Sequence, residues 1–233
     1  MRTRILLIIL ALVPALGAGA AASARSSATA LDPARFTTQI DNRWFPVIPG
    51  TTYVYTGVEG GAHARDVVTV EHATITIAGV RCRVVRDLLY RRGHLAERTA
   101  DWYAQDRSGN VWYFGEATAE LDRKGQVTST EGSWTAGVKG AKPGIVMLAH
   151  PVVGKAYRQE FFKGQAEDFA RVIGVFRGVV GGGPETVLTE EWTPLEPGVL
   201  DHKLYARGIG NVVERTVKGG NDNLELTSLR RTP

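Results

Sequence analysis

The chain has 233 residues, of which 43% are hydrophobic and 22% are charged, and its formal net charge is +4. This apolar content excludes an intrinsically disordered chain, and the single cysteine excludes a small fold held together by disulfides. A chain of this length can bury about 70% of its unfolded surface. It can therefore fold around an apolar core without a metal, and we expect no cofactor.

The N-terminus predicts export. Arg2 and Arg4 precede an apolar run, Ile5–Leu16, and small residues follow up to Ala22-Ser23-Ala24. This order is typical of a secretory signal peptide with an A-x-A cleavage site. The apolar run is shorter than the roughly 20 residues of a transmembrane helix. We therefore expect residues 1–24 to be removed, leaving a mature protein without a transmembrane anchor that is secreted or held in the cell envelope.

The mature chain is only weakly basic. Removal of the two N-terminal arginines lowers the net charge to +2. The basic cluster Arg81, Arg83 and Arg86 is interleaved with apolar residues, as on one face of a strand. No stripe of Lys and Arg interleaved with aromatic residues is present, so we expect no nucleic-acid partner.

Cys82 alternates with Arg81 and Arg83 and therefore shares a strand face with Val80 and Val84. This position favours a small buried side chain. The alternative is a reactive thiol whose pKa the arginines lower.

Period-two patterns run through the rest of the chain. β-Branched and aromatic residues alternate with polar ones in short segments, and glycine-containing turns separate most of these segments. The predicted strands are residues 51–55, 67–70, 73–77, 80–85, 99–105, 110–115, 126–130, 156–162, 186–193, 202–206, 212–217 and 224–229. The best helical pattern, residues 164–172, gives only one short apolar face.

Many short strands without alternating helices predict an all-β fold. We expect an antiparallel meander that curls into a barrel or half-barrel, because closure removes exposed strand edges. The expected organisation is a flexible leader over residues 25–35 and a single β-rich domain over residues 36–233. Residues 138–151, rich in Gly and Pro, are interpreted as a crossing loop or a weak domain boundary.

Three stretches carry a resemblance to known proteins. They are residues 42–55 (NRWFPVIPGTTYVY), the pair 101–106 and 109–116 (DWYAQD and GNVWYFGE), and residues 191–198 (EWTPLEPG). Together they resemble a group of uncharacterised secreted bacterial β-rich proteins over most of the mature chain. The resemblance implies export and a hairpin tip at Asp106–Asn110. It implies no activity, because no catalytic residues are established for that group.

Established metal and nucleophile motifs are absent from the sequence. There is no H-E-x-x-H, no paired C-x-x-C and no EF-hand loop, so we expect no metal site. Asp106–Asn110 resembles half a calcium loop, but it lacks a third acid and a terminal Glu and is interpreted as a turn. Gly132-Ser133-Trp134 lacks the G-x-S-x-G elbow of a serine hydrolase.

Acidic residues give the most unusual local pattern. A hairpin around Lys163-Gly164 is predicted to bring Glu160 and Glu167 together, and Tyr157 and His202 are candidates for the same barrel interior. Such a cluster serves as an acid–base pair or as a polar anchor for a ligand. The alternative is that the two acids pair with nearby Arg and Lys side chains on the solvent face.

Trp102 and Trp112 fall on two strands joined by the Asp106–Asn110 turn. Cross-strand pairing is expected there. The two indoles are candidates to line a cavity and stack on an apolar or sugar-like ligand, and core packing is the alternative.

Three functional hypotheses follow. The leading one is a non-enzymatic barrel that binds a small hydrophobic, lipid-like or sugar-like ligand. Its candidate ligand-binding residues are Trp102, Trp112, Tyr157, Glu160, Glu167, His202 and Tyr205. The second is a secreted hydrolase or cyclase-like enzyme that uses Glu160 or Glu167 with His202. The third is a cell-envelope structural or interaction module without a pocket, so the presence of an interior cavity discriminates between the hypotheses.

Overall fold

The computed structural model describes residues 31–178 and 183–232. Within these ranges the regular structure is one 3-10 turn, η1 (Pro33–Arg35), and β-strands. In chain order the strands are β1 (Phe36–Thr37), β2 (Thr51–Glu59), β3 (Ala62–Ile77), β4 (Val80–Arg91), β5 (His94–Asp106), β6 (Val111–Leu121), β7 (Val127–Ser129), β8 (Trp134–Thr135), β9 (Lys142–Met147), β10 (Ala156–Arg158), β11 (Glu160–Phe161), β12 (Phe169–Phe176), β13 (Thr186–Trp192), β14 (Leu200–Ala206), β15 (Gly210–Lys218) and β16 (Asn223–Arg231). The predicted all-β class is confirmed.

The predicted signal peptide, residues 1–24, and the first part of the predicted leader, residues 25–30, lie outside the described residues. The leader residue Leu31 packs against a core cluster, together with Phe36 of β1. No helix in the described ranges is long and apolar enough to cross a membrane.

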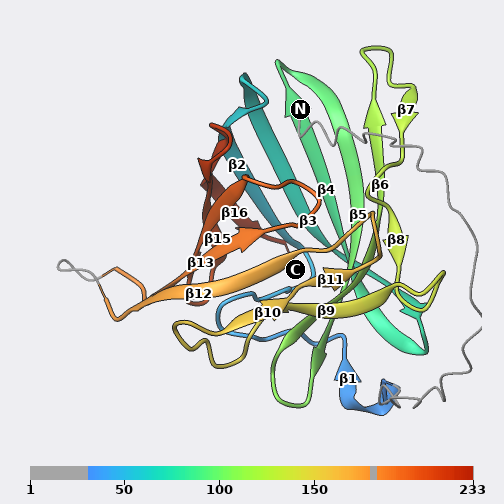
Figure 1. Cartoon of the computed structure of the whole chain (residues 1–233), viewed down its shortest axis with the longest axis vertical. Helices are drawn as coiled ribbons and strands as arrows, with labels where there is room; N and C mark the ends of the chain where they lie inside the picture. The colour runs from blue at the N-terminus through green and yellow to red at the C-terminus, as the bar shows by residue number, and fades with distance from the viewer. Residues whose placement is uncertain (1–30, 179–182, 233) are drawn as a thin grey trace, which may run out of the picture.

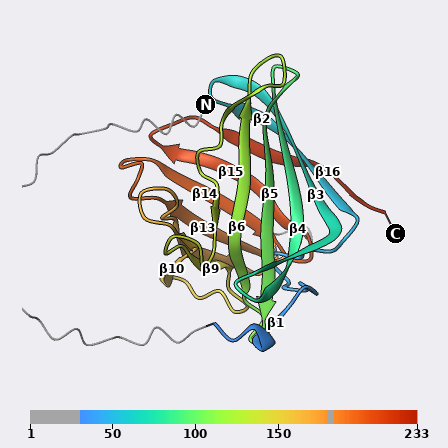
Figure 2. The same cartoon turned by 90° about the vertical axis from the view of Figure 1, so that its right-hand side faces the viewer.

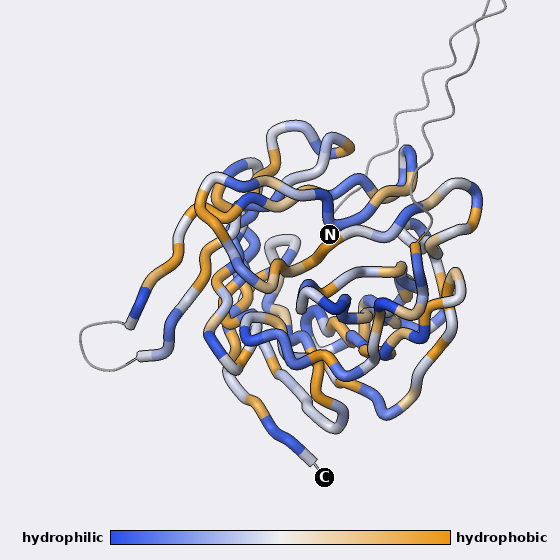
Figure 3. Tube along the Cα trace, turned by 90° about the horizontal axis from the view of Figure 1, so that it is seen from below, coloured by the Kyte–Doolittle hydropathy of each residue, from blue (hydrophilic) through white to orange (hydrophobic). Residues whose placement is uncertain are grey.

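All the strands belong to one sheet with antiparallel pairing. From one end to the other the order is β10-β12-β13-β14-β15-β16-β2-β3-β4-β5-β6-β9-β11, and β1, β7 and β8 add to β5 or β6. The long strands β2–β6 form one wall (Figure 1), and β12–β16 form the opposite wall, which crosses behind them in Figure 2. Hydrophobic and hydrophilic residues are interspersed along the chain rather than gathered in one block (Figure 3).

The two ends of the sheet meet in a single segment of chain. β10 pairs with β12, β11 pairs with β9, and only Gln159 separates β10 from β11. The backbones approach closely at this seam, where a Cβ added to Gly144 would lie 2.5 Å from the carbonyl oxygen of Arg158. The sheet is thereby nearly closed, which confirms the predicted curling of the meander into a barrel.

Two strands lie where the sequence does not predict a strand, because their residues lack a clear alternation of apolar and polar side chains. β9 lies within residues 138–151, where Pro143 and Gly144 interrupt the usual alternation and the sequence predicts a loop or boundary. β12 overlaps residues 164–172, where the sequence offers at best a short helical face. In the fold, Ala170 and Val172 of β12 are buried.

β3 is one strand rather than the two that the sequence predicts over residues 67–70 and 73–77. A bulge between Val70 and Thr74 interrupts its pairing with β4. The guanidinium of Arg83 occupies this bulge and donates to the carbonyl oxygen of His72 at 2.7 Å. The bulge therefore accounts for the break in the strand pattern between residues 70 and 73.

Residues 40–50, here called the plug, close one end of the barrel. The side-chain amide of Asn42 donates to the carbonyl oxygen of Gly109 at 2.8 Å, in the turn between β5 and β6. On the opposite wall, the backbone N–H of Gly208 donates to the carbonyl oxygen of Arg43 at 2.7 Å. These bonds tie the plug to both walls at the end of the barrel that it crosses.

Two apolar clusters flank the wall of long strands. The first lies inside the barrel against the plug and includes Ile40, Trp44, Val47, Tyr53, Tyr55, Val70, Val85, Val111, Met147, Leu148, Val172, Val187 and Tyr205. The second lies on the outer face of β4–β6 and includes Ile77, Val80, Cys82, Ala104, Phe114, Trp134, Ala136, Ala141 and Ala166. Cys82 is fully buried there, as predicted, and burial raises the pKa of its thiol to about 12.

Candidate functional site

The barrel interior contains a cavity of two neighbouring parts. The larger part, here called the outer chamber, has a volume of about 560 Å³ and extends to Glu120 and Glu131, which are exposed to solvent. The smaller part, here called the inner chamber, has a volume of about 200 Å³ and reaches Phe45 and Pro46 of the plug. The two chambers share seven lining residues, namely Asp66, Asp87, Asp101, Tyr103, Lys203, Glu214 and Leu224.

Acidic side chains dominate the wall of the outer chamber. Thirteen of the 24 Asp and Glu residues of the chain line it, against two of the 28 Lys and Arg residues, Arg91 and Lys203. The acids are Glu59, Asp66, Asp87, Glu97, Asp101, Glu116, Glu120, Glu131, Glu160, Asp168, Glu191, Glu214 and Asp222. Acidic side chains are thus concentrated inside the barrel, although the net charge of the chain is positive.

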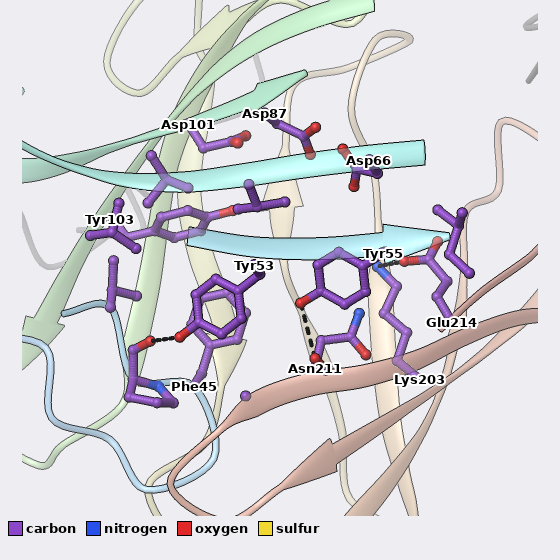
Figure 4. A pocket seen from close by; sticks show the side chains of 17 residues that line it. Phe45, Tyr53, Tyr55, Asp66, Asp87, Asp101, Tyr103, Lys203, Asn211 and Glu214 are labelled. Carbon is purple, nitrogen blue, oxygen red and sulfur yellow. Dashed lines mark hydrogen bonds and ion pairs between the residues drawn. The ribbon is translucent and has the colours of Figure 1, made fainter. Parts of the chain in front are cut away.

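Three of these acids form a row across the long strands at the boundary of the chambers. Asp66 of β3, Asp87 of β4 and Asp101 of β5 lie on inward-facing positions that the antiparallel register places diagonally next to one another. Figure 4 shows the three carboxyls side by side above the rings of Tyr103, Tyr53 and Tyr55. We call this group the carboxyl row.

Burial raises the pKa values of all three carboxyls in the row. The pKa of Asp66 is raised to about 6, and a hydrogen bond with Asp87 partly opposes that rise. The pKa of Asp101 is raised to about 7, by burial first and by the charge of Asp87 second. The pKa of Asp87 lies well above its usual range, through burial and then the charge of Asp66. Near neutral pH the row is therefore only partly ionised.

Tyrosines support the row and form the wall beneath it. The hydroxyl of Tyr113 donates to Asp101 at 2.6 Å, and the ring of Tyr113 stacks on Tyr103 with centroids 4.9 Å apart. Below the row, the Tyr55 hydroxyl donates to the carbonyl oxygen of Asn211 at 2.9 Å. These contacts fix the orientation of the carboxyl row and of the rings.

Lys203 faces the row from the opposite wall (Figure 4). Its ammonium lies 3.3 Å from carboxylate oxygens of both Glu191 and Glu214. Arg91, the other cation of the outer chamber, pairs with Glu59 at 3.0 Å. Each internal cation therefore already has acidic partners on its own part of the wall.

Two acceptor atoms of the inner chamber lack a donor among the described residues. Oδ1 of Asp66 and Oδ1 of Asn211 are both buried, and neither has a hydrogen-bond partner. Both residues line the inner chamber. Because a buried acceptor without a donor is costly, these atoms indicate where a ligand N–H or O–H fits.

Glu160 lies where the sequence predicts, but its partner differs. It lines the outer chamber, and the hairpin that follows is closed by a bridge between Phe162 and Ala166. In that register the backbone N–H of Gln159 donates to the carbonyl oxygen of Asp168 at 2.8 Å, and Asp168 lines the chamber. Glu167, one residue earlier, instead accepts from the N–H of Gly164 at 2.8 Å within the turn.

His202 is not brought to Glu160. Its neighbour Lys203 lines both chambers, and adjacent residues of a strand face opposite sides. The His202 imidazole lies on the outer face, 3.9 Å from a carboxylate oxygen of Glu190. The Glu–His acid–base pair expected from the sequence is therefore not assembled in this fold.

The predicted aromatic lining residues lie outside the two chambers. Trp102 alternates with the inward-facing Asp101 and Tyr103, and both Trp102 and Trp112 pack against the outer apolar cluster. The indole N–H of Trp112 donates to Asp106 at 2.8 Å. The two tryptophans therefore pack in an apolar cluster, which is the alternative to lining a ligand cavity.

Tyr205 and Tyr157 belong to the core around the cavity rather than to its lining. Tyr205 is buried in the inner apolar cluster, and its hydroxyl donates to Glu191 at 3.2 Å. Tyr157 packs against the same cluster. Of the seven predicted ligand-binding residues, Glu160 alone lines either chamber.

The carboxyl row is the feature that sequence reasoning misses. Its signal is an acid at an otherwise apolar strand position: Asp66 stands between Ala64 and Val68, and Asp87 stands between Val85 and Leu89, each at period two. Among the described residues no group of His, Cys, Asp and Glu has a geometry that could hold a metal ion.

Comparison with known proteins finds no matching family model, and no curated protein matches the chain. A Bacteroides fragilis protein with a YmcC-like fold, inferred to be exported, aligns with a TM-score of 0.44 and 13% identity over 81% of this chain and 99% of that one. A Parabacteroides distasonis protein, inferred to be a lipoprotein, aligns with a TM-score of 0.39 and 10% identity over 80% of this chain and 98% of that one. What can be inferred about function therefore rests on the cavity itself.

Proposed function

We propose that this protein is an exported barrel that binds a small, positively charged ligand in its interior. The observation that carries the proposal is the composition of the outer chamber, with thirteen acidic and two basic lining residues. Export rests on the signal-peptide pattern of residues 1–24.

The electrostatics of the chamber favour a cation. Carboxylates crowded in a poorly solvated space repel one another and resist ionisation, as the raised pKa values of Asp66 and Asp101 indicate. A bound cation offsets this repulsion and supplies hydrogen-bond donors to carboxylate oxygens, which act only as acceptors when ionised.

This proposal revises the ligand expected from the sequence. A lipid-like ligand in the outer chamber would remove water from many carboxyls without giving them donors, which is costly. A neutral sugar offers donors but no charge to offset the repulsion. An ammonium or guanidinium group supplies both.

The two other hypotheses from the sequence are less well supported. An interior cavity of about 560 Å³ is at odds with an interaction module that has no pocket. An enzyme based on Glu160 and His202 is disfavoured because the two residues face opposite sides of the barrel wall.

Calorimetric titration of the mature protein tests the proposal. Spermidine, a small polycation, is the probe, and glycerol and succinate at equal concentration are the neutral and anionic comparisons. We expect heat of binding for spermidine alone. Asp101→Asn should weaken binding about tenfold, because a hydrogen bond to a charged group is worth about 1.5–3 kcal/mol.

Glu225→Gln is the matched control. Glu225 lies on the outer face, pairs with Arg215 at 3.4 Å and is 54% exposed at its side chain. The proposal fails if no cation binds, or if Glu225→Gln weakens binding as much as Asp101→Asn does.

A further inference from the structure

We infer that the ligand is an amphiphilic amine, in which a single primary ammonium group sits at one end of an aromatic ring or short alkyl chain. Its ammonium binds at the carboxyl row, and its apolar body fills the inner chamber. This inference rests on the proposed function and names the class of cation.

The first step is the wall of the inner chamber. Below the carboxyl row it is built mainly from rings and aliphatic side chains, namely Phe45, Tyr53, Tyr55, Val68, Val70 and Val85. An engineered protein cavity of about 150 Å³ is enough to hold benzene. A chamber of about 200 Å³ therefore has room for one ring or a short chain.

The second step is that the hydroxyls of Tyr53 and Tyr55 in this wall are already occupied. Tyr53 donates to the carbonyl oxygen of Pro46 at 3.2 Å, and Tyr55 donates to that of Asn211 at 2.9 Å. Their rings, rather than their hydroxyls, are thus left for a ligand (Figure 4). An apolar body fits against such rings better than a second charged group does.

The third step is the position of the charge. Asp66, Asp87 and Asp101 line both chambers, so they stand where the apolar wall gives way to the acidic one. Oδ1 of Asp66 and Oδ1 of Asn211 are buried acceptors without a donor among the described residues. A primary ammonium group carries three N–H donors, and the carboxyl oxygens of the row can accept them.

The plug fixes the direction of binding. Phe45 and Pro46 of the plug line the far side of the inner chamber, whereas the acidic outer chamber leads to the exposed Glu120 and Glu131. A ligand that enters from the open end with its apolar body first therefore comes to rest with its ammonium group at the carboxyl row.

Three probes of similar size separate this inference from the proposed function. They are 2-phenylethylamine, putrescine, which has two ammonium groups and no ring, and 2-phenylethanol, which has the ring without the charge. In calorimetric titrations at pH 8 and low salt we expect 2-phenylethylamine to bind at least about tenfold more tightly than either of the others. Equal or tighter binding of putrescine would overturn the inference and leave the proposed function standing. Binding by none of the amines, spermidine included, would overturn both.

A filled inner chamber gives a second test. Val68 lines that chamber, and Val68→Phe places a ring where the ligand's body is expected. This variant should lose at least about tenfold in affinity for 2-phenylethylamine and keep its affinity for putrescine. Val67→Phe, the same change at the outward-facing neighbour, is the control and should change neither. Unchanged binding of 2-phenylethylamine by a folded Val68→Phe variant would contradict the inference.

If Val68→Phe does not fold, two measurements on the unaltered protein test the same inference. Isotope-filtered NMR should show contacts between the ring protons of 2-phenylethylamine and tyrosine ring protons of the inner chamber. At pH 6.5, binding at the carboxyl row should also release protons, so the heat of binding should vary with the ionisation enthalpy of the buffer. Absence of both signals in a saturated complex would overturn the inference.

Discussion

The inner and outer faces of the long-stranded wall carry opposite charge although the same strands build both. Arg65 and Asp66 are adjacent on β3, and Arg86 and Asp87 are adjacent on β4. In each pair the arginine is exposed and the aspartate lines the cavity. A net charge of +4 therefore describes neither face. The comparison teaches that, in a barrel, the sign of charge relevant to a ligand is set by strand parity rather than by composition.

The largest expected effect comes from neutralising one face at a time. Asp66→Asn, Asp87→Asn and Asp101→Asn combined should weaken 2-phenylethylamine binding about 1,000-fold, because about 4 kcal/mol of charge-assisted hydrogen bonding is lost. Arg65→Gln, Arg86→Gln and Arg98→Gln combined, on exposed positions of the outer face, should change it less than about twofold, since exposed charges interact weakly through solvent. Calorimetry at pH 8 measures both, and similar losses in the two triple variants would refute the assignment of faces.

The second prediction concerns pH. The folded-state pKa of Asp101 is about 7 and that of Asp66 about 6, both above the usual 3.8. Between these values and 3.8 the folded protein binds more protons than the unfolded chain, so this part of its stability is lost as the pH rises towards 7. We expect the free energy of unfolding to be on the order of 2–4 kcal/mol larger at pH 5 than at pH 8.

Urea denaturation at the two pH values measures this difference. Asp101→Asn should reduce it, mainly by stabilising the protein at pH 8, whereas Glu225→Gln on the outer face should leave it unchanged. A protein that is most stable at pH 8 would show that the carboxyl row is not buried as described.

The third prediction concerns the seam at which the two ends of the sheet meet. Closure there separates the interior of the barrel from its outer face. A Cβ on Gly144 would lie 2.5 Å from backbone atoms of Arg158 and Gln159. Gly144→Ala should therefore lower the free energy of unfolding by about 1–3 kcal/mol, through overpacking. Thermal unfolding measures the loss, and an unchanged Tm would mean that β9 and β10 are not in close contact.

The smallest effect is expected at Cys82. It is fully buried under the apolar cluster of the outer face, and its thiol has a pKa of about 12. Burial and the scarcity of thiolate should together prevent reaction with DTNB at pH 8 in the native state, while the thiol reacts fully in urea. Rapid labelling of the folded protein would show that the outer cluster is open to solvent.

Local features of the fold could be predicted from sequence because neighbouring residues determine them. The Asp106–Asn110 hairpin tip is an example, since one oxygen of Asp106 accepts from the N–H groups of Ser108 and Asn110 at 2.8 and 2.9 Å. The strand at Thr51–Tyr55 likewise follows from its own alternation, with Tyr53 and Tyr55 buried. Such elements need no knowledge of distant partners.

The cavity could not be predicted in the same way, because it depends on register between distant strands. Gly115 is an example: Val111 and Tyr113 face inward before it, and Glu116 and Thr118 do so after it. Its φ of 130° and its close approach to Trp134 allow this switch of parity. The hairpin after Glu160 gives a second example. Its register is shifted by one residue from the predicted one, so Asp168 rather than Glu167 lines the chamber.

The pairing of β16 with β2 has a consequence for how this barrel forms. The N–H of Thr232 donates to the carbonyl oxygen of Gly50 at 3.0 Å, and Arg231 pairs with Thr51, so the C-terminal strand completes the sheet beside its first long strand. Such non-local pairing makes folding slow, because a long stretch of chain must be ordered before the contact is gained. The chambers, which β16 lines through Leu224, are therefore complete only once this strand has paired.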